Sequence, residues 1–177
     1  MHITHSQSVL SKFLFNDTNS AWFWLILRVY LGYEWLYAGY EKVINPAGAW
    51  IGANAGTAIT GFLNGSLQKV GGAHPDVSGW YAYLIQHVAL PNATLFSYMV
   101  TYGEVAIGLA LIFGLFTGLA AFFATFMNFN FMLAGTVSVN PEWALMGIFL
   151  FMARKVAGYY GLDRYASPVC QKFFKRK

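Results

Sequence analysis

The sequence predicts an all-α integral membrane protein, in which a four-helix transmembrane bundle carries short interfacial helices between its first two spans. Of the 177 residues, 57% are hydrophobic and only 10% are charged, whereas soluble domains carry about 25% charged residues. Four apolar stretches reach the ~17–25 residues that a membrane-spanning helix needs. The alternative, a soluble helical protein with a very apolar core, fits this composition poorly. A chain of this length is expected to form a single domain, 1–177.

The predicted spans are separated by residues that interrupt helices. The second and third spans nearly join, so the stretch from Gly114 to Gly118 must hold a tight reversal. Pro141 separates the third span from the fourth, because proline lacks a backbone donor and restricts the residue before it. The expected spans are about 21–44, 96–115, 117–137 and 142–160.

The segment 45–95 between the first two spans is too long for a plain loop. Apolar residues recur at helical spacing from Thr57 to Val70 and again from Trp80 to Leu90. Glycines 71 and 72 and Pro75 lie between these two patterns and favour a break. We therefore expect two short amphipathic helices that lie at the outer interface and cap the bundle.

The distribution of charge predicts the orientation in the membrane. Seven of the eleven basic residues lie in 154–177, in and next to the predicted tail 161–177. Basic juxtamembrane segments stay in the cytoplasm and contact anionic lipid, and four spans then bring the N-terminus to the same side. The expected location is the plasma membrane, multi-pass, with both termini cytoplasmic and the lipid bilayer, not nucleic acid, as partner. Cys170 is the single cysteine, so no cysteine-pair redox centre can form within one chain.

The first predicted span contains charged residues, namely Arg28, Glu34 and Glu41. A charge at the centre of a bilayer costs ~2.5–3.5 kcal/mol on insertion scales. Such side chains face the interior of a bundle, a partner charge or a water-filled cavity. They predict a buried polar site among the helices.

Helix rise indicates which polar groups lie at one depth. If each span is centred in the membrane, Glu34, Glu104 and Asn128 share the midplane, and Arg28 lies about 6 Å toward the cytoplasm. The expected arrangement pairs Arg28 with Glu104 or Glu34 and lets Asn128 hydrogen-bond the remainder. These four residues would bound a small cavity for a ligand.

Each of these features also has a structural interpretation. Arg28 and Glu104 could form a clamp that only fixes helix packing, and Asn128 could be an interhelical hydrogen-bonding residue. Glu41 and Lys42 could extend to the headgroups. His74 and His87 stand alone without carboxylate or cysteine at metal-ligand spacing, so no metal site is predicted. No phosphate loop, dinucleotide fingerprint or serine nucleophile motif is present.

Three motifs of this chain carry a resemblance to a known family. The first span, LRVYLGYEWLYAGYEKV, presents Arg28, Gly32, Gly39 and Lys42. The stretch YGEVAIGLALIFGLFTGLAA, which runs from the second span into the third, presents Gly103, Glu104, Gly108 and Gly114. The end, AGYYGLDRY, holds Gly158, Gly161 and Asp163. Together they resemble the DoxX superfamily of small four-helix membrane proteins. The outer segment, with AHPDVSGWY and LPN, is closer to the DoxD branch, the membrane subunit of a thiosulfate:quinone oxidoreductase.

The resemblance implies electron transfer from thiosulfate to a membrane quinone. The candidate substrate or quinone-binding residues are Arg28, Glu34, Tyr37, Glu104 and Asn128. Thiosulfate is a dianion that needs cationic donors, for which the outer candidates are Lys42, His74 and His87. No catalytic residue is identified. The quinone is the candidate acceptor and no covalently bound cofactor is expected, since the sequence carries no haem, iron–sulfur or flavin motif.

The DoxA-type segment is not part of this chain, so a DoxA-like or other redox subunit is an expected partner. Two other functions stay open. The chain could be a non-catalytic scaffold or accessory subunit of a redox or stress complex. It could also be a small-molecule transporter that uses Arg28, Glu34 and Glu104 as a path, which for so small a bundle would require a homo-oligomer.

Overall fold

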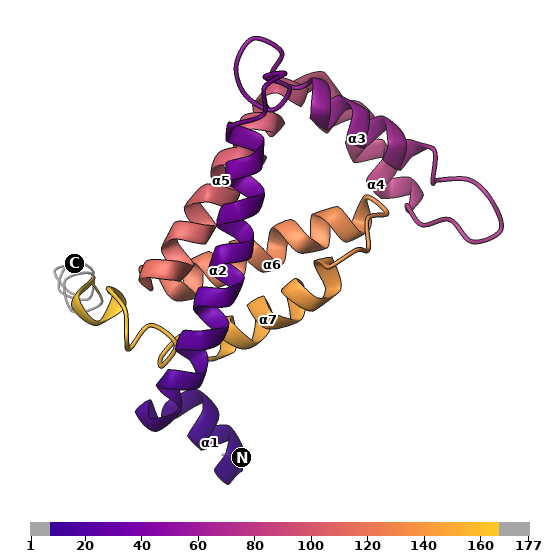
Figure 1. The fold of residues 1–177 in the computed structure, drawn as a ribbon. Helices are drawn as coiled ribbons and strands as arrows, with labels where there is room; N and C mark the ends of the chain where they lie inside the picture. The colour runs from indigo at the N-terminus through magenta and orange to yellow at the C-terminus, as the bar shows by residue number, and fades with distance from the viewer. Residues whose placement is uncertain (1–7, 167–177) are drawn as a thin grey trace, which may run out of the picture.

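The computed structural model describes residues 8–166, and this part of the chain folds into helices joined by turns, without a β-strand (Figure 1). The predicted tail beyond residue 166, including Cys170, lies outside the described residues. The α-helices are α1 (Val9–Asn16), α2 (Ala21–Val43), α3 (Thr57–Leu67), α4 (Gly79–Leu84), α5 (Ala93–Phe113), α6 (Thr117–Leu133) and α7 (Asn140–Met152). Short helical turns η1 (Thr18–Ser20), η2 (Ile85–Ala89) and η3 (Leu90–Asn92) connect some of them.

The centre of the fold is the antiparallel pair of α2 and α5, which pack more extensively than any other two elements of the described chain. Glycines make their close approach feasible. A Cβ atom added at Gly108 of α5 would lie 2.5 Å from the Leu36 backbone nitrogen of α2, and one at Gly39 would lie 2.8 Å from Val105 N. Such distances are shorter than carbon–nitrogen contact allows, so the two backbones touch where side chains would normally separate them.

The helix that contains α5 is longer than the sequence predicted. The chain is helical from Gly79 to Phe113, a run of 35 residues with a mean hydropathy of 1.6 in its most apolar part. A π-helical turn at η2 and Pro91 in η3 interrupt the regular pattern, and such features bend helices. The expected separate interfacial helix from Trp80 to Leu90 is therefore the bent beginning of the helix that continues as α5, while α3 is the independent helix of the outer segment.

Within residues 8–166, this run is the one helix whose length and composition suffice to cross a membrane, and α6 is a shorter apolar helix. Because α2 lies along α5, α2 occupies the same depth. The expected number of four spans stays a prediction.

Two of the helices end earlier than the spans that the sequence predicted. The third ends at Leu133 instead of residue 137, where Gly135 adopts a φ of 75°, the left-handed conformation that commonly ends helices. The fourth ends at Met152 instead of residue 160. Its 13 residues rise only about 20 Å, less than the ~30 Å hydrocarbon layer. The chain then continues in turns, in which Ala153, Val156 and Ala157 remain buried against the bundle.

The described N-terminal residues form the short helix α1, which is attached to the bundle. Ser8 caps α1 by accepting a hydrogen bond from the Ser11 backbone N–H at 3.1 Å. The Trp24 indole of α2 donates to the Leu14 carbonyl at 2.7 Å and thereby attaches α1 to the bundle. The described N- and C-terminal residues lie at one end of α2, and the loop that follows α2 lies at the other (Figure 1). We call these the inner and outer ends.

The outer segment closes back on the α6–α7 hairpin. Lys69 Nζ donates to the Gly135 carbonyl at 2.6 Å, and the Tyr81 hydroxyl donates to the Asn130 carbonyl at 3.1 Å. Trp35 of α2 packs against Trp143 of α7, with ring centroids 5.7 Å apart. The bundle is thus held at its outer end by polar contacts and in its interior by aromatic packing.

Replacing Gly108 with alanine should destabilise the protein by roughly 1–3 kcal/mol, because the added methyl group collides with the backbone of α2. The measurement is thermal unfolding of the purified protein in detergent. Gly103→Ala is the matched control on the same helix, since its Cβ would lie 3.5 Å from Met127 Sδ, an ordinary contact. Equal effects of the two substitutions would show that α2 and α5 do not touch at Gly108.

The orientation predicted from the basic tail is tested by labelling in intact cells. With Cys170 replaced by serine, a cysteine at the exposed position His74 should react with a membrane-impermeant maleimide from outside. A cysteine at the exposed position Arg164 should react only after lysis, since it lies at the opposite end. The reverse pattern would refute the orientation.

Candidate functional site: two charged clusters at the ends of one helix

The first charged cluster surrounds Arg28 at the inner end of α2. Its side chain is 1% exposed, and Nη2 donates a long hydrogen bond of 3.4 Å to the Tyr160 carbonyl. Nε and Nη1 have no hydrogen-bond partner among the described residues. Asp163 is the carboxylate whose charge acts on the guanidinium. Arg28 is therefore held by the segment that follows α7.

Asp163 joins that segment to the turn between α5 and α6. Its two carboxylate oxygens accept hydrogen bonds from the backbone N–H groups of Phe116 at 2.6 Å and Thr117 at 2.9 Å. Carboxylates at a helix N-terminus satisfy its free donors and its dipole. The Asp163 N–H in turn donates to the Gly114 carbonyl at 2.7 Å. Arg28 and Asp163 thus fasten the C-terminal turns to the inner end of the bundle.

Glycines are required at this inner cluster for steric reasons. Gly114 has a φ of 63°, and a Cβ there would collide with the Arg28 guanidinium. A Cβ at Gly161 would lie 2.8 Å from the Gly114 carbonyl oxygen, and one at Gly158 would collide with the Asp163 carboxylate. The glycine-rich end that resembles the family motif has a packing role in this structure.

The second charged cluster lies at the outer end of α2. Lys42 Nζ is 2.6 Å from a carboxylate oxygen of Glu104 on α5, and these side chains are 17% and 3% exposed. The ammonium group also donates to the Ala38 carbonyl at 3.2 Å and lies 5.0 Å from the centre of the Trp50 ring. A charge pair this deeply buried needs such additional partners, because removal from water costs each ion several kcal/mol.

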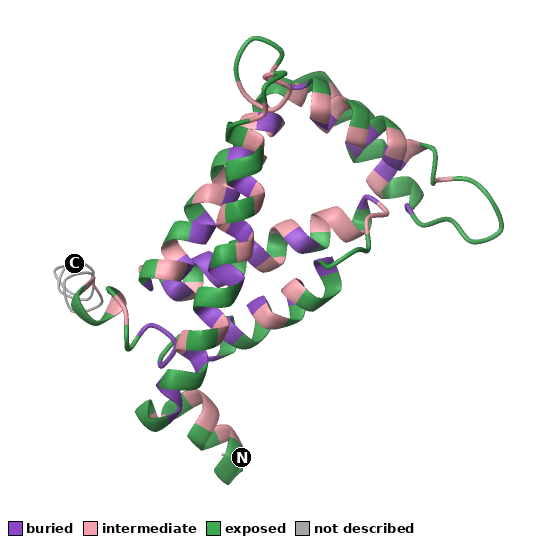
Figure 2. Ribbon diagram, in the orientation of Figure 1, coloured by how far each residue is buried: buried purple, intermediate pink, exposed green. Residues whose placement is uncertain are grey.

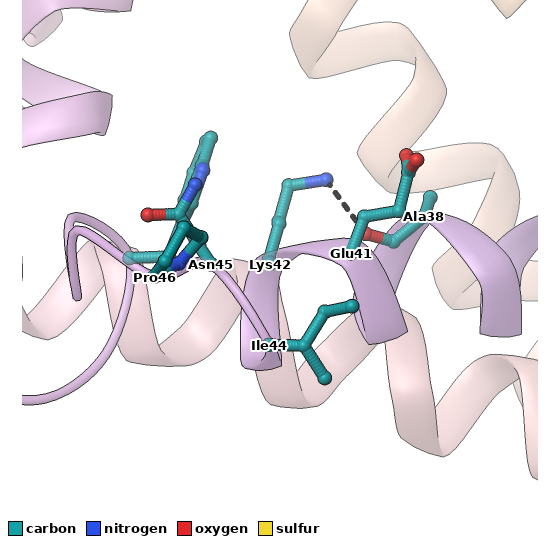
Figure 3. Close-up of a pocket in the computed structure, with 7 residues that line it drawn as sticks. Ala38, Glu41, Lys42, Ile44, Asn45 and Pro46 are labelled. Atoms are coloured by element: carbon teal, nitrogen blue, oxygen red, sulfur yellow. Dashed lines mark hydrogen bonds between the residues drawn. The ribbon is translucent and has the colours of Figure 1, made fainter.

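A groove opens beside this pair. Figure 3 shows Lys42 turned toward Ala38, with Glu41 next to it on α2 and Asn45 and Pro46 just beyond the helix. The groove has a volume of about 450 Å³, is open, and is lined by both polar and apolar side chains. Its lining residues are Ala38, Glu41, Lys42, Ile44, Asn45, Pro46 and Trp50.

The expected pairing of Arg28 with Glu104 is wrong. Glycine contacts place Gly39 against Glu104, and Arg28 lies against Gly114 at the far end of α5. The 11 residues from Arg28 to Gly39 correspond to about 16 Å along the helix, beyond the reach of one ion pair. The centres of α2 and α5 are offset, because α2 extends farther toward the inner end, so Glu104 is level with the end of α2.

The other candidate ligand-binding residues, Glu34, Tyr37 and Asn128, belong to neither charged cluster. Glu34 is half-buried in the middle of α2, and Tyr37 is 49% exposed on the outer surface of that helix. Asn128 of α6 is fully buried, but both of its amide atoms have no partner within the described part of the chain. The structure therefore separates Arg28, Glu34 and Glu104, and it shows no hydrogen bond from Asn128 to any of them.

The three outer cationic candidates also lie apart. His74 is exposed in the loop between α3 and α4. His87 stacks on Tyr83 with ring centroids 4.0 Å apart and contacts the Tyr83 carbonyl at 3.0 Å. Lys42 is bound to Glu104. Residues 8–166 contain no cluster of three or more His, Cys, Asp or Glu side chains arranged to hold a metal ion.

These features define a helical, membrane-associated protein with a buried lysine–glutamate pair at the outer end of its central helix pair. The chain belongs to the DoxX family, since the family model for DoxX matches residues 23–139, more than half of the sequence. The match includes Arg28, Lys42 and Glu104, whereas Gly158, Gly161 and Asp163 lie beyond it. No curated protein and no solved structure shows significant similarity to the chain.

One feature of the sequence indicated that Lys42 is the partner of Glu104. Lys42 shares a helical face with Arg28, Gly32 and Gly39, which is the face that contacts α5. Reading Lys42 as a residue that extends to the headgroups overlooked that a lysine on this face is turned toward Glu104.

A double-mutant cycle tests which basic residue is coupled to Glu104. Lys42→Met and Glu104→Gln should each cost about 3–5 kcal/mol, because each leaves a buried charge or polar group without its partner. The double variant should lose clearly less than the sum. Arg28→Met combined with Glu104→Gln should instead be additive to within about 0.5 kcal/mol. Thermal or denaturant unfolding measures these effects, and coupling of Arg28 with Glu104 would contradict the structure.

Proposed function

We propose that this DoxX protein is the membrane subunit of a redox system and that a membrane quinone is reduced in the groove beside Lys42. The observation that carries the proposal is the Lys42–Glu104 pair, which presents a fixed ammonium group at the edge of a groove with mixed polar and apolar lining at the outer end of α2. A quinone needs apolar contacts for its ring, a donor for its carbonyl oxygens and groups that hold protons. In the groove, Trp50 and Ile44 offer apolar contacts, Lys42 is a donor and Glu41 is a carboxylate that can hold a proton.

The residues of the groove have distinct roles in this proposal. The Lys42 ammonium donates a hydrogen bond to a quinone carbonyl, and charge-assisted bonds of this kind are among the stronger ones. The Trp50 ring provides an apolar face for the quinone ring. Conversion of the quinone to the quinol takes up two electrons and two protons. Glu104 and Glu41 are the carboxylates next to Lys42 that hold protons for this step.

The electrons come from outside this chain in our proposal. The resemblance to the DoxD branch favours thiosulfate as donor and a DoxA-like subunit as the protein that oxidises it. This chain then binds the quinone and supplies its protons, while the partner subunit provides the redox centre. The three outer cations, which lie apart, are not assigned to one thiosulfate site.

Of the two alternatives, transport is the less favoured, because Arg28 and Glu104 belong to clusters about 16 Å apart along α2 and do not form one path. The scaffold alternative differs from ours in a measurable way: a scaffold subunit needs a stoichiometric protein partner but no affinity for quinone.

Quinone binding to the purified protein in nanodiscs tests the proposal. A short-chain ubiquinone or menadione should quench tryptophan fluorescence, since Trp50 lines the groove. Lys42→Met should weaken binding about tenfold or more, the effect of losing a hydrogen bond to a charged group. Lys155→Met is the matched control, because Lys155 is exposed at the inner end of the bundle.

Ile44→Trp provides a second variant that leaves the ion pair intact. Ile44 is 55% exposed and lines the groove, so a larger side chain there should block quinone without loss of thermal stability. Unchanged affinity in both Lys42→Met and Ile44→Trp would place the quinone elsewhere. A wild-type protein that binds no quinone, alone or with a partner subunit, would favour the scaffold alternative.

A further inference from the structure

The loop between α2 and α3, residues 45–56, forms one wall of the groove at the outer end of the bundle (Figure 1). This loop is hydrogen-bonded to itself. The Asn45 side chain accepts from the Ala47 backbone N–H at 3.2 Å, and the Asn54 side chain donates to the Ala47 carbonyl at 2.8 Å. Of the described loop residues, Gly56 alone is buried (Figure 2). The loop is therefore an internally bonded unit that contributes little to the core.

Ser97 of α5 makes the strongest polar contact with this loop. Its hydroxyl donates to the Trp50 carbonyl at 2.6 Å, and its side chain is 0% exposed. Tyr98 and Thr94 also hydrogen-bond to the loop, at 3.3 Å and 3.2 Å, but both of these bonds are exposed. A short hydrogen bond that is shielded from water holds its partners more firmly than a long bond that competes with solvent.

The residue that Ser97 holds carries the ring next to the ammonium group of the groove. The centre of the Trp50 ring lies 5.0 Å from Lys42 Nζ, a distance at which an aromatic face attracts a cation. The same ring packs against the small apolar cluster that contains Ile59. The Lys42 side chain is 17% exposed. The ring thus covers part of the ammonium group, and Ser97 fixes the backbone from which the ring extends.

One face of α5 holds both the ammonium group and its cover. Ser97, Thr101 and Glu104 follow one another at spacings of four and three residues, so they share a face of the helix. Glu104 binds Lys42, and Ser97 binds the loop. The Thr101 hydroxyl between them is buried and has no partner among the described residues. The contact of this face with the loop at Trp50 is therefore made by Ser97.

We propose that Ser97 is a positioning residue of the groove: its hydrogen bond holds the Trp50 ring over Lys42 and so controls the access of water and small molecules to the ammonium group. The inference rests on the proposed function in one respect, since it gives the same site a means of regulation. Because the loop is bonded largely to itself, it can move as a unit while α2 and α5 stay in contact. Local opening of such a segment costs less free energy than global unfolding.

The acetylation rate of Lys42 measures this access. The full-length protein in nanodiscs is treated with sulfo-N-hydroxysuccinimide acetate, and mass spectrometry follows each lysine. Ser97→Ala should raise the rate at Lys42 about fivefold, the change in open population caused by loss of one ordinary hydrogen bond. Exposed Lys12 at the inner end is the internal reference. Thr101→Val is the matched control, since it removes a buried hydroxyl from the same face without breaking a bond to the loop, and it should leave the rate unchanged.

A double variant tests whether Ser97 acts through the ring. Trp50→Ala should raise the acetylation rate at Lys42 at least as much as Ser97→Ala does, and adding Ser97→Ala to it should cause no further rise. An unchanged rate in Ser97→Ala, an equal rise in Thr101→Val, or independent effects of Ser97→Ala and Trp50→Ala would each overturn the proposal.

Hydrogen exchange of the wild-type protein provides a measurement that needs no variant. The amides of the loop should exchange through a local opening while those of α5 stay protected, and joint exchange of the loop with α5 would contradict a loop that moves as a unit. Quinone is absent from all of these measurements. Their failure would leave the quinone proposal standing, and a protein that binds no quinone would leave the role of Ser97 standing.

Discussion

The close contact between α2 and α5 determines where every charged group of this protein lies. Two backbones approach through Gly32, Gly39 and Gly108, with no room for a Cβ between them. Such contact leaves little freedom for one helix to slide along the other, because a shift would drive side chains into the space that glycine leaves open. The register of the pair is therefore a packing property, and the ion pairs follow from it.

The register of α2 against α5 places the charged side chains in two clusters, and the two clusters have different roles. At the inner end, Arg28 and Asp163 fasten the turns after α7 to the start of α6, with glycines filling the narrow space around them. At the outer end, Lys42 and Glu104 lie beside a groove. Removing the charged groups of either cluster from water costs free energy. A groove that a small molecule can enter opens beside the outer cluster, and the inner cluster fastens the chain to itself. These observations are the basis for assigning ligand binding to the first and a structural role to the second.

The sequence predicted the helical class, the bounds of α2 to within one residue, the reversal at Gly114 and the residues that carry buried charge. It did not predict which of these residues meet. The expected midplane cluster assumed that each span is centred in the membrane, but the helix of α5 begins at Gly79 and α2 is displaced toward the inner end. The expected fourth span was drawn too long, because residues 153–160 include Arg154 and Lys155 and fold into turns. The Tyr160 carbonyl at their end accepts a hydrogen bond from Arg28 in the inner cluster.

The site depends on the register of α2 against α5, and cross-linking between the two helices measures this register directly. Lys42 and Glu104 are in contact, whereas Arg28 lies about 16 Å farther along α2. In a Cys170→Ser protein with a protease site in the loop 45–56, Lys42→Cys with Glu104→Cys should keep the two fragments linked after reaction with a short bismaleimide and cleavage. Arg28→Cys with Glu104→Cys, the pair expected if Glu104 were at the midplane of α2, should let the fragments separate. A link at position 28 and none at position 42 would contradict the register and, with it, the assignment of Lys42 and Glu104 to one site.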